Sequence, residues 1–172
     1  MADVVTNLLG RLKRRVMSFT SPPPDLNFIT DSLAVGAACA DERQLRALAD
    51  LDIGAVVDLR AEAVDDAELL GRLGIRFLHL PTADWRPMSQ EDLDRGTDWV
   101  LDQLSDGRKT LIHCGHGIGR SVLLTAAVLV RMGYPWQEAM QVIQRKRPRA
   151  GPRDEQLAAL AEFARRHRRS AT

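Results

Sequence analysis

The sequence predicts an α/β fold, a single domain with a central, largely parallel sheet and helices on both of its faces. Short apolar runs rich in β-branched residues alternate with segments whose apolar residues recur at helical spacing, which is typical of strands joined by crossover helices. One of these runs leads through a glycine-rich loop into a strongly apolar helical segment. The length of 172 residues fits one domain with room for a sizeable core.

The N-terminal segment predicts a separate element. In residues 1–20 the apolar side chains fall within an arc of roughly 140° on a helical wheel, with basic residues opposite the arc, at its edge and inside it. The prolines at 22–24 then form a stiff spacer. We therefore expect an amphipathic basic helix and spacer over residues 1–24, a folded domain over 25–169 and a tail over 170–172. The helix either packs on the domain or lies on a membrane surface.

In the first half of the domain, the sequence predicts one small hairpin, two further strands and two helices. Residues 28–35 alternate in hydropathy around a polar turn, as a small hairpin does. Apolar residues at helical spacing predict short helices over 42–51 and 63–73. The β-branched run at 55–59 predicts a buried strand, and residues 75–80 predict another that the following proline ends.

The second half of the domain continues the alternation. A loop over residues 81–88 precedes Ser89, which is a suitable helix cap because Asp92 lies three residues on. The expected elements are a helix from Ser89 to about residue 104, a strand over 110–113 and helices over 121–132, 135–145 and 154–164. The helix at 121–132 is the most apolar, so we expect it to be central.

Composition excludes several classes of protein. With 24 Lys and Arg against 23 Asp and Glu, a net charge of +1 gives no electrostatic case for binding nucleic acid. Two cysteines are too few for a disulfide framework or an all-cysteine zinc site. No apolar run is long enough to span a membrane, and basic residues interrupt what would be a secretory signal. The sequence therefore predicts a cytoplasmic protein, either free or in peripheral contact with a membrane through residues 1–20.

The most informative segment runs from His113 to Ser121 and reads His-Cys-Gly-His-Gly-Ile-Gly-Arg-Ser. A loop that leads into a helix N-terminus directs backbone N–H groups and the positive end of the helix dipole at one point, which favours an anion. The alternate glycines let the backbone curl into such a nest, and Arg120 offers a planar fork that matches two phosphate oxygens. The loop therefore predicts a site for a tetrahedral dianion.

Cys114 stands at the start of this loop, where the N–H groups, the helix N-terminus and Arg120 all favour its thiolate. A thiolate is a nucleophile at neutral pH, and Ser121 can donate a hydrogen bond to the sulfur when it leaves a phosphocysteine. Cys39 has no glycines and no arginine at the same spacing, so we expect a small buried side chain there. The alternative for the loop is a structural glycine-rich turn.

The segment resembles the His-Cys-x5-Arg-Ser signature of the cysteine-dependent protein tyrosine phosphatase superfamily. The chain is similar to the small dual-specificity branch over about residues 26–165, and looks like the part of it that contains phosphatidylglycerophosphate phosphatases. The resemblance implies a phosphatase-type phosphate-binding loop between a strand and the central helix. It also implies two-step phosphomonoester hydrolysis without metal or other cofactor, in which Cys114 attacks phosphorus, Arg120 holds the equatorial oxygens and an aspartic acid protonates the leaving oxygen.

Asp84 is the expected acid, because it lies in the loop between a strand and a helix where the family carries its acid. A carboxyl group there can protonate the leaving oxygen and then, as a carboxylate, activate water. The alternative for Asp84 is an Asx-turn or a helix cap. The loop departs from the Trp-Pro-Asp sequence of the large receptor-type enzymes, so their loop closure is not carried over.

Other residues complete the expected site. His113 is expected to pack behind the loop and support the thiolate, while His116 either faces the pocket mouth or lies in solvent. The residues expected to contact the substrate phosphate are Gly115, His116, Gly117, Ile118 and Gly119.

Five further residues carry weaker signals. Asp58 is expected to be structural. Gln156 either lies near the nucleophilic water, as the resemblance to the family implies, or lies on a polar helix face, and we expect the second. Arg147 and Arg149 either flank the pocket and bind a second anionic group or are solvated, and we expect the second, because arginines near helix ends are usually solvated. Trp85 either lines the entrance of the pocket or covers the core.

The expected function is hydrolysis of phosphotyrosine in proteins, and secondarily of phosphoserine or phosphothreonine. The alternative substrate class is a phospholipid or inositol phosphate, and a third reading is a non-catalytic phosphate-binding module. A sulfur-transfer enzyme of the rhodanese type is disfavoured by the Arg120-Ser121 ending and by the separate acid loop. The expected partners are therefore a phosphorylated protein or a phospholipid, with no metal and no nucleic acid.

Overall fold

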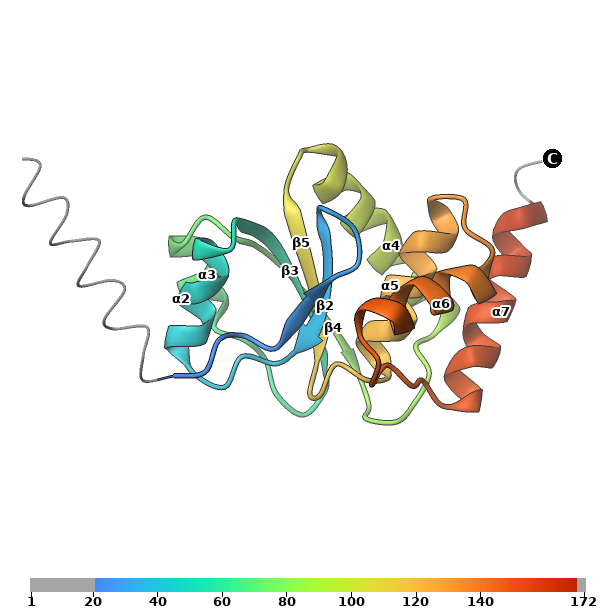
Figure 1. The fold of residues 1–172 in the computed structure, drawn as a ribbon, viewed down its shortest axis with the longest axis horizontal. Helices are drawn as coiled ribbons and strands as arrows, with labels where there is room; N and C mark the ends of the chain where they lie inside the picture. Colours follow the sequence, from blue (N-terminus) through green and yellow to red (C-terminus); the bar gives the residue numbers. More distant parts are fainter. Residues whose placement is uncertain (1–20, 170–172) are drawn as a thin grey trace, which may run out of the picture.

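The computed structural model describes residues 21–169, and it confirms the predicted α/β fold (Figure 1). The helix expected over residues 1–20 and the tail at 170–172 lie outside the described residues. Five strands form one sheet in the order β1-β2-β5-β3-β4. All pairs are parallel except the first, in which β1 (Leu26–Phe28) pairs antiparallel with β2 (Leu33–Ala37) as the predicted hairpin.

The centre of the sheet is formed by β3 (Ile53–Arg60) and β5 (Lys109–Cys114), whose side chains are almost all buried because helices cover both faces. The edge strand β4 (Arg76–Thr82) corrects the prediction that Pro81 ends a strand. An edge strand has one side without a partner, so the missing N–H of proline costs no ladder hydrogen bond there.

Two groups of helices cover the two faces of the sheet (Figure 1). One face carries α2 (Glu42–Asp50) and α3 (Ala67–Arg72), whose buried leucines join a core with β3 and β4. The larger core lies on the other face. It is covered by α4 (Gln90–Ser105), α5 (Arg120–Arg131), α6 (Trp136–Lys146) and α7 (Asp154–Arg169).

The predicted helix over residues 63–73 is wrong at its start, because α3 begins only after Asp66, whose carboxylate accepts from Leu69 N–H. Residues 61–66 form a loop instead, since Asp65 is buried and its carboxylate bonds Arg60 and His113. The last helix, α7, runs to Arg169, beyond the predicted end at residue 164.

The central position expected for α5 is confirmed. Ten consecutive residues from Arg120 to Leu129 are buried, because α5 packs between the sheet and the three other helices of its layer. This helix follows directly from β5 through the glycine-rich loop, so the buried core fixes both ends of that loop. Among the described residues, no helix is long and apolar enough to cross a bilayer.

Candidate active site

Cys114 is the last residue of β5, and its side chain is 3% exposed at the base of the loop. Its Sγ lies 3.3 Å from the Ser121 hydroxyl in the first turn of α5. Gly119 caps α5 without any side-chain hydrogen bond, so the first N–H groups of the helix stay available to an anion. The structure thus places the predicted thiol, hydroxyl and helix N-terminus together.

The surroundings of Cys114 favour its thiolate. Burial alone raises the pKa of the thiol, but hydrogen bonds from the Ser121 hydroxyl and N–H, from Gly117 N–H and the charge of Arg120 bring it below the ordinary value. Cys39 shows the contrast, because burial raises the pKa of this thiol to about 12. Of the two cysteines, only Cys114 therefore has surroundings that lower the pKa of its thiol.

Arg120 is 2% exposed and contacts three different segments, at Glu62, Thr82 and Asp84. Its Nη1 and Nη2 donate to the Glu62 carboxylate at 2.8 and 2.7 Å, and Nη1 also donates to Thr82 O at 2.8 Å. The hydrogen bonds that Arg120 donates to Glu62 raise the pKa of Arg120, and the same contacts lower the pKa of Glu62 to about 2. Within the described part of the chain, the buried Arg120 Nε has no partner, so one donor of the fork is open to a ligand.

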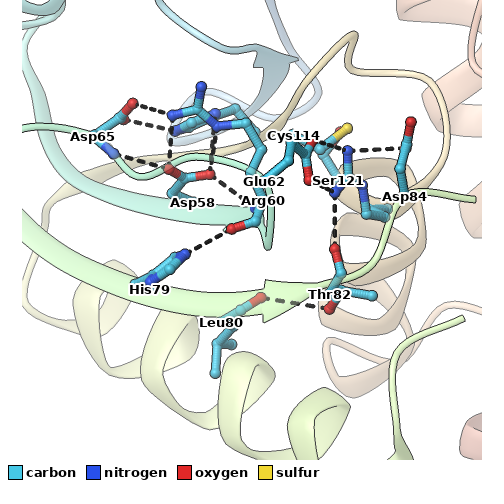
Figure 2. Close-up of polar contacts among 12 residues, drawn as sticks. Asp58, Arg60, Glu62, Asp65, His79, Leu80, Thr82, Asp84, Cys114 and Ser121 are labelled. Carbon is cyan, nitrogen blue, oxygen red and sulfur yellow. Dashed lines mark hydrogen bonds and ion pairs between the residues drawn. The ribbon is translucent and has the colours of Figure 1, made fainter. Parts of the chain in front are cut away.

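Asp84 lies in the loop after β4 and points toward the arginine (Figure 2). Its Oδ1 is 2.9 Å from Arg120 Nη2, and the same oxygen accepts from Trp85 N–H at 3.0 Å. Its side chain is 45% exposed, so water and a leaving group can both reach the carboxyl group. The structure therefore places Asp84 at the pocket, and its one local contact, to the N–H of the next residue, is neither the Asx-turn nor the helix cap of the alternative.

Trp85 lines the pocket mouth, which decides between its two predicted positions. The residue is 52% exposed and has a φ of 64°, a left-handed conformation that is strained for a bulky side chain. The Arg153 guanidinium carbon lies 4.2 Å from the centre of the indole ring. Trp85 is thus an aromatic wall of the pocket, next to Asp84 in the same loop.

His113 belongs to a buried polar network behind the loop. Its Nε2 lies 2.8 Å from Asp65 Oδ2, and its Nδ1 is 3.9 Å from Asp58 Oδ1. Arg60 donates to both aspartates, at 2.8 Å to Asp58 Oδ2 and 2.6 Å to Asp65 Oδ1 (Figure 2). Although burial raises it, the pKa of Asp58 lies below its ordinary value because of the hydrogen bond from Arg60. Asp58 is therefore structural, as predicted.

Three residues of this network could together hold a metal ion, because their possible ligand atoms lie close to one another. Among the described residues, they are the group found with this property, namely Asp58, Asp65 and His113. The guanidinium of Arg60 already bonds both carboxylates, and Asp65 N–H donates to Asp58 at 3.0 Å. A cation placed there would face the positive charge of Arg60 at hydrogen-bond distance. We therefore interpret the cluster as an internal ion-pair network that fixes His113.

Two predicted solvent positions are wrong. Arg147 is only 1% exposed, because its guanidinium is enclosed by the loop and by β1. Gln156 is also 1% exposed, and its amide links two backbones: it donates to Arg86 O and accepts from Arg153 N–H, both at 3.0 Å. Arg149, in contrast, is half exposed as expected.

The pocket above Cys114 has a volume of about 270 Å³. Its polar floor and its partly apolar wall come from three segments, namely the acid loop, the glycine-rich loop and the start of α7. The lining residues are Asp84, Trp85, Cys114, His116, Ile118, Gly119, Arg120 and Gln156. His116 thus lies at the pocket, although its side chain is exposed.

Sequence reasoning missed Glu62, Asp65 and Arg60. A signal was present, because Arg60 and Glu62 stand at or just after the carboxyl end of β3, which is the neighbour of β5 in the sheet. Ligand-binding residues gather at the carboxyl ends of parallel strands, so polar side chains at this position were candidates. Their order in the chain alone does not show that they turn toward Arg120 and His113.

Comparisons with known proteins show the family of the chain. A family model described as "Dual specificity phosphatase, catalytic domain" matches residues 37–166. The human "Phosphatidylglycerophosphatase and protein-tyrosine phosphatase 1" is 33% identical over 95 residues, which are 54% of this chain and 47% of that protein. The rat protein of the same name is 32% identical over 94 residues, 53% of this chain and 48% of that one. The chain thus spans about half the length of these relatives.

Solved structures resemble the whole domain. The active form of Tk-PTP superposes with a TM-score of 0.77 at 34% identity and covers 83% of this chain and 98% of that one. PTPMT1 in complex with PI(5)P gives a TM-score of 0.80 at 22% identity, over 86% of this chain and 99% of that one. At that identity the second likeness concerns the fold alone.

Proposed function

This chain belongs to the dual-specificity phosphatase catalytic-domain family, and from that premise we propose that it hydrolyses phosphate monoesters through a cysteinyl-phosphate intermediate. The family makes it a cysteine-dependent phosphatase. The observation that carries the proposed mechanism is the meeting of three groups at one pocket: a buried thiol with a lowered pKa, an arginine with an open Nε and a half-exposed carboxyl group.

In the first step, the Cys114 thiolate attacks phosphorus, so that an S–P bond forms while the P–O bond to the leaving group breaks. Protonated Asp84 gives its proton to the leaving oxygen, which then departs as a neutral alcohol or phenol. Arg120 and the loop N–H groups hold the three equatorial oxygens, whose charge they stabilise in the transition state.

In the second step, Asp84 as carboxylate takes a proton from water, and the water oxygen attacks phosphorus. The S–P bond breaks, inorganic phosphate forms and sulfur leaves as a thiolate. The Ser121 hydroxyl, 3.3 Å from the sulfur, stabilises that thiolate by a hydrogen bond. The cycle returns the enzyme with Asp84 protonated and Cys114 ionised, so protons and charges balance.

Arg120 and the loop supply electrostatic stabilisation of the kind that metal ions give in other phosphoryl-transfer sites. The mechanism therefore predicts that a chelator leaves the hydrolysis of an aryl phosphate unchanged. Loss of the rate with chelator and its return with a divalent ion would contradict the mechanism.

As the principal substrate we propose phosphotyrosine, with phosphoserine and phosphothreonine as secondary substrates. Trp85 and Ile118 line the pocket above the thiol, so a phenyl ring carrying the phosphate has apolar surfaces beside it. Two basic side chains near the mouth, His116 and Arg153, favour a second candidate, a phospholipid or inositol phosphate with further negative charge. The name of the human relative includes activity on phosphatidylglycerophosphate, which supports the same candidate.

One panel separates these substrates. Phosphotyrosine peptides, phosphoserine peptides, phosphatidylglycerophosphate and phosphoinositides are compared by kcat/KM with wild type and with Cys114→Ser. We expect turnover by wild type, greatest on phosphotyrosine, and none by the variant, because a serine hydroxyl is not ionised at neutral pH. Activity in the variant would contradict the nucleophile, and higher kcat/KM on a lipid would replace the proposed substrate.

The predicted membrane contact through residues 1–20 is a separate proposal that rests on sequence alone. We expect the full chain to bind anionic vesicles in a salt-dependent way and a chain starting at Asp25 not to bind them. Equal binding by both chains, or none by either, would remove the membrane contact and weaken the lipid candidate.

A further inference from the structure

The carbonyl groups of the phosphate loop are all held from outside the loop. At its start, Gly115 O accepts from Ala38 N–H at 3.3 Å, and at its end, Ile118 O accepts from Gly151 N–H at 3.0 Å. The two carbonyls between them, of His116 and Gly117, accept from arginine side chains instead. Buried backbone groups need partners, so these contacts fix how each peptide plane of the loop is turned.

Arg147 makes the main contacts to these two central peptides. Its Nε donates to Gly117 O at 2.7 Å, and its Nη2 donates to His116 O at 3.2 Å. The half-exposed Arg149 adds one contact of 3.3 Å to His116 O. Space around Gly117 is closed, because a Cβ there would lie 2.4 Å from Arg147 Nη2 and 2.6 Å from the Gly36 carbonyl. The guanidinium and the loop thus fit directly against each other.

The other edge of the same guanidinium is bound to β1 and to the residue before it. Arg147 Nη1 donates to Asn27 Oδ1 at 2.8 Å and to Asp25 Oδ1 at 3.1 Å, while Nη2 reaches Asp25 Oδ2 at 3.3 Å. These contacts hold the guanidinium from both sides. Its five donors in a rigid plane serve five acceptor atoms, which a lysine ammonium with three donors cannot do.

The direction of the loop N–H groups follows from the geometry of the peptide bond. In a trans peptide the C=O of one residue and the N–H of the next point in opposite directions. Because the His116 and Gly117 carbonyls point to Arg147, the N–H groups of Gly117 and Ile118 point to the opposite side. Consistent with this, a hydrogen bond from the Gly117 N–H is one of the contacts that lower the pKa of the Cys114 thiol.

We propose that Arg147 is a positioning residue of the phosphate loop: by holding the His116 and Gly117 carbonyls, it keeps the N–H groups of Gly117 and Ile118 directed at the sulfur and at bound phosphate. This deepens the proposed function, on which its consequence for catalysis rests. Arg147 does not touch the substrate and acts only through these two peptides.

A competing explanation is that Arg147 acts only as a positive charge. Burial lowers the pKa of Arg147, while the charge of the Cys114 thiolate opposes that change, so the two groups interact electrostatically. The two explanations separate on Arg147→Lys, which keeps the charge and loses the planar fork. Arg145→Met is the matched control, because Arg145 is exposed in the last turn of α6, just before Arg147.

The experiment needs no turnover. The rate of Cys114 alkylation by iodoacetate is measured against pH to give the thiolate pKa, and inorganic phosphate is titrated as a protecting ligand to give its affinity. For Arg147→Lys we expect a higher thiolate pKa and at least about tenfold weaker protection by phosphate, since oriented N–H donors stabilise both anions. Arg145→Met is expected to match wild type in both. Thermal melting is recorded for each variant.

A lysine variant that matches wild type in thiolate pKa and in phosphate affinity would overturn the proposal in favour of charge alone. A variant with a lower melting temperature but wild-type values for both would also overturn it, because that result shows a merely structural role. Arg147→Met provides the second test, and it should exceed the effect of lysine in both readouts. If wild type binds phosphate in this way but hydrolyses no substrate, the proposed function fails while the positioning role stands.

Discussion

Replacing Glu62 by glutamine tests the pairing that holds the phosphate-binding arginine in place. Glu62 accepts two hydrogen bonds from Arg120, at 2.8 and 2.7 Å, and this pairing lowers the pKa of Glu62 from 4.5 to about 2. Glutamine has nearly the same shape and keeps one acceptor oxygen, but it carries no charge. The change therefore removes the charged part of the pairing and leaves the size of the side chain.

The size of the effect follows from this pKa difference. A shift from 4.5 to about 2 corresponds at full strength to roughly 3.4 kcal/mol, at about 1.36 kcal/mol per pKa unit. The Glu62 side chain is 48% exposed, so water screens much of this attraction, and exposed pairs contribute up to about 1 kcal/mol. We therefore expect Glu62→Gln to lower the free energy of unfolding by about 1 kcal/mol at pH 7, or the melting temperature by about 2–4 °C.

The dependence on pH gives the prediction its direction. Because the pKa of Glu62 is lower in the folded protein than in the unfolded chain, its contribution to stability is complete above about pH 4.5 and is lost as the pH falls toward 2. At pH 3, roughly 60% of the contribution of Glu62 to stability is lost. Thermal melts of wild type and Glu62→Gln at pH 7, 5 and 3 measure this. Glu68→Gln is the control, because Glu68 and its partner Arg72 both lie on the surface.

The reasoning on Glu62 has two ways to fail. Equal melting temperatures of wild type and Glu62→Gln at pH 7 would show that the pairing contributes no stability. A difference that stays constant between pH 7 and pH 3 would show that the loss comes from packing and not from the charge. Either result would refute the electrostatic account of how Arg120 is held.

Three further predictions concern the other groups of the site. Asp84→Asn should slow substrates with poor leaving groups by ~10²-fold or more and activated aryl phosphates much less, and equal slowing across a leaving-group series would contradict its role as the acid. Arg120→Lys should lower kcat/KM by more than ~10²-fold, because a point charge replaces the fork, and wild-type activity would contradict the fork. Asp65→Asn should lower the free energy of unfolding by about 3 kcal/mol in urea denaturation, since it leaves the buried His113 without its charged partner and Arg60 with Asp58 alone, and a loss under about 1 kcal/mol would argue against the network.

The parts of the site that were predictable from sequence lie close together along the chain. Cys114, Arg120 and Ser121 fall within one loop and one helical turn, and the spacing of those residues alone brings them to one point. Asp84 was found through its place after a strand, which is also a local signal. The fold was predictable for the same reason, since strand and helix periodicities are local.

The parts that were missed depend on contacts between distant segments. Arg147 and Gln156 were expected in solvent because most arginines and glutamines are exposed, and no local pattern shows that backbone carbonyls enclose them. Residues 63–66 of this loop were predicted as helix, because the sequence does not show that Asp65 is buried against His113 of another strand. Pro81 was misjudged since its effect depends on whether the strand lies at an edge.

The bond between Asp25 and Arg147 joins residues that are 122 positions apart, near the two ends of the described domain. During synthesis, a nascent chain that has emerged as far as the end of α5 already holds the thiol, the arginine fork and the acid, but it lacks the residue that turns the loop peptides. Contacts of such separation form late, because closing a long stretch of chain costs conformational entropy before the contact stabilises it. Recovery of thiolate reactivity during refolding would therefore report the docking of Arg147 between β1 and the phosphate loop.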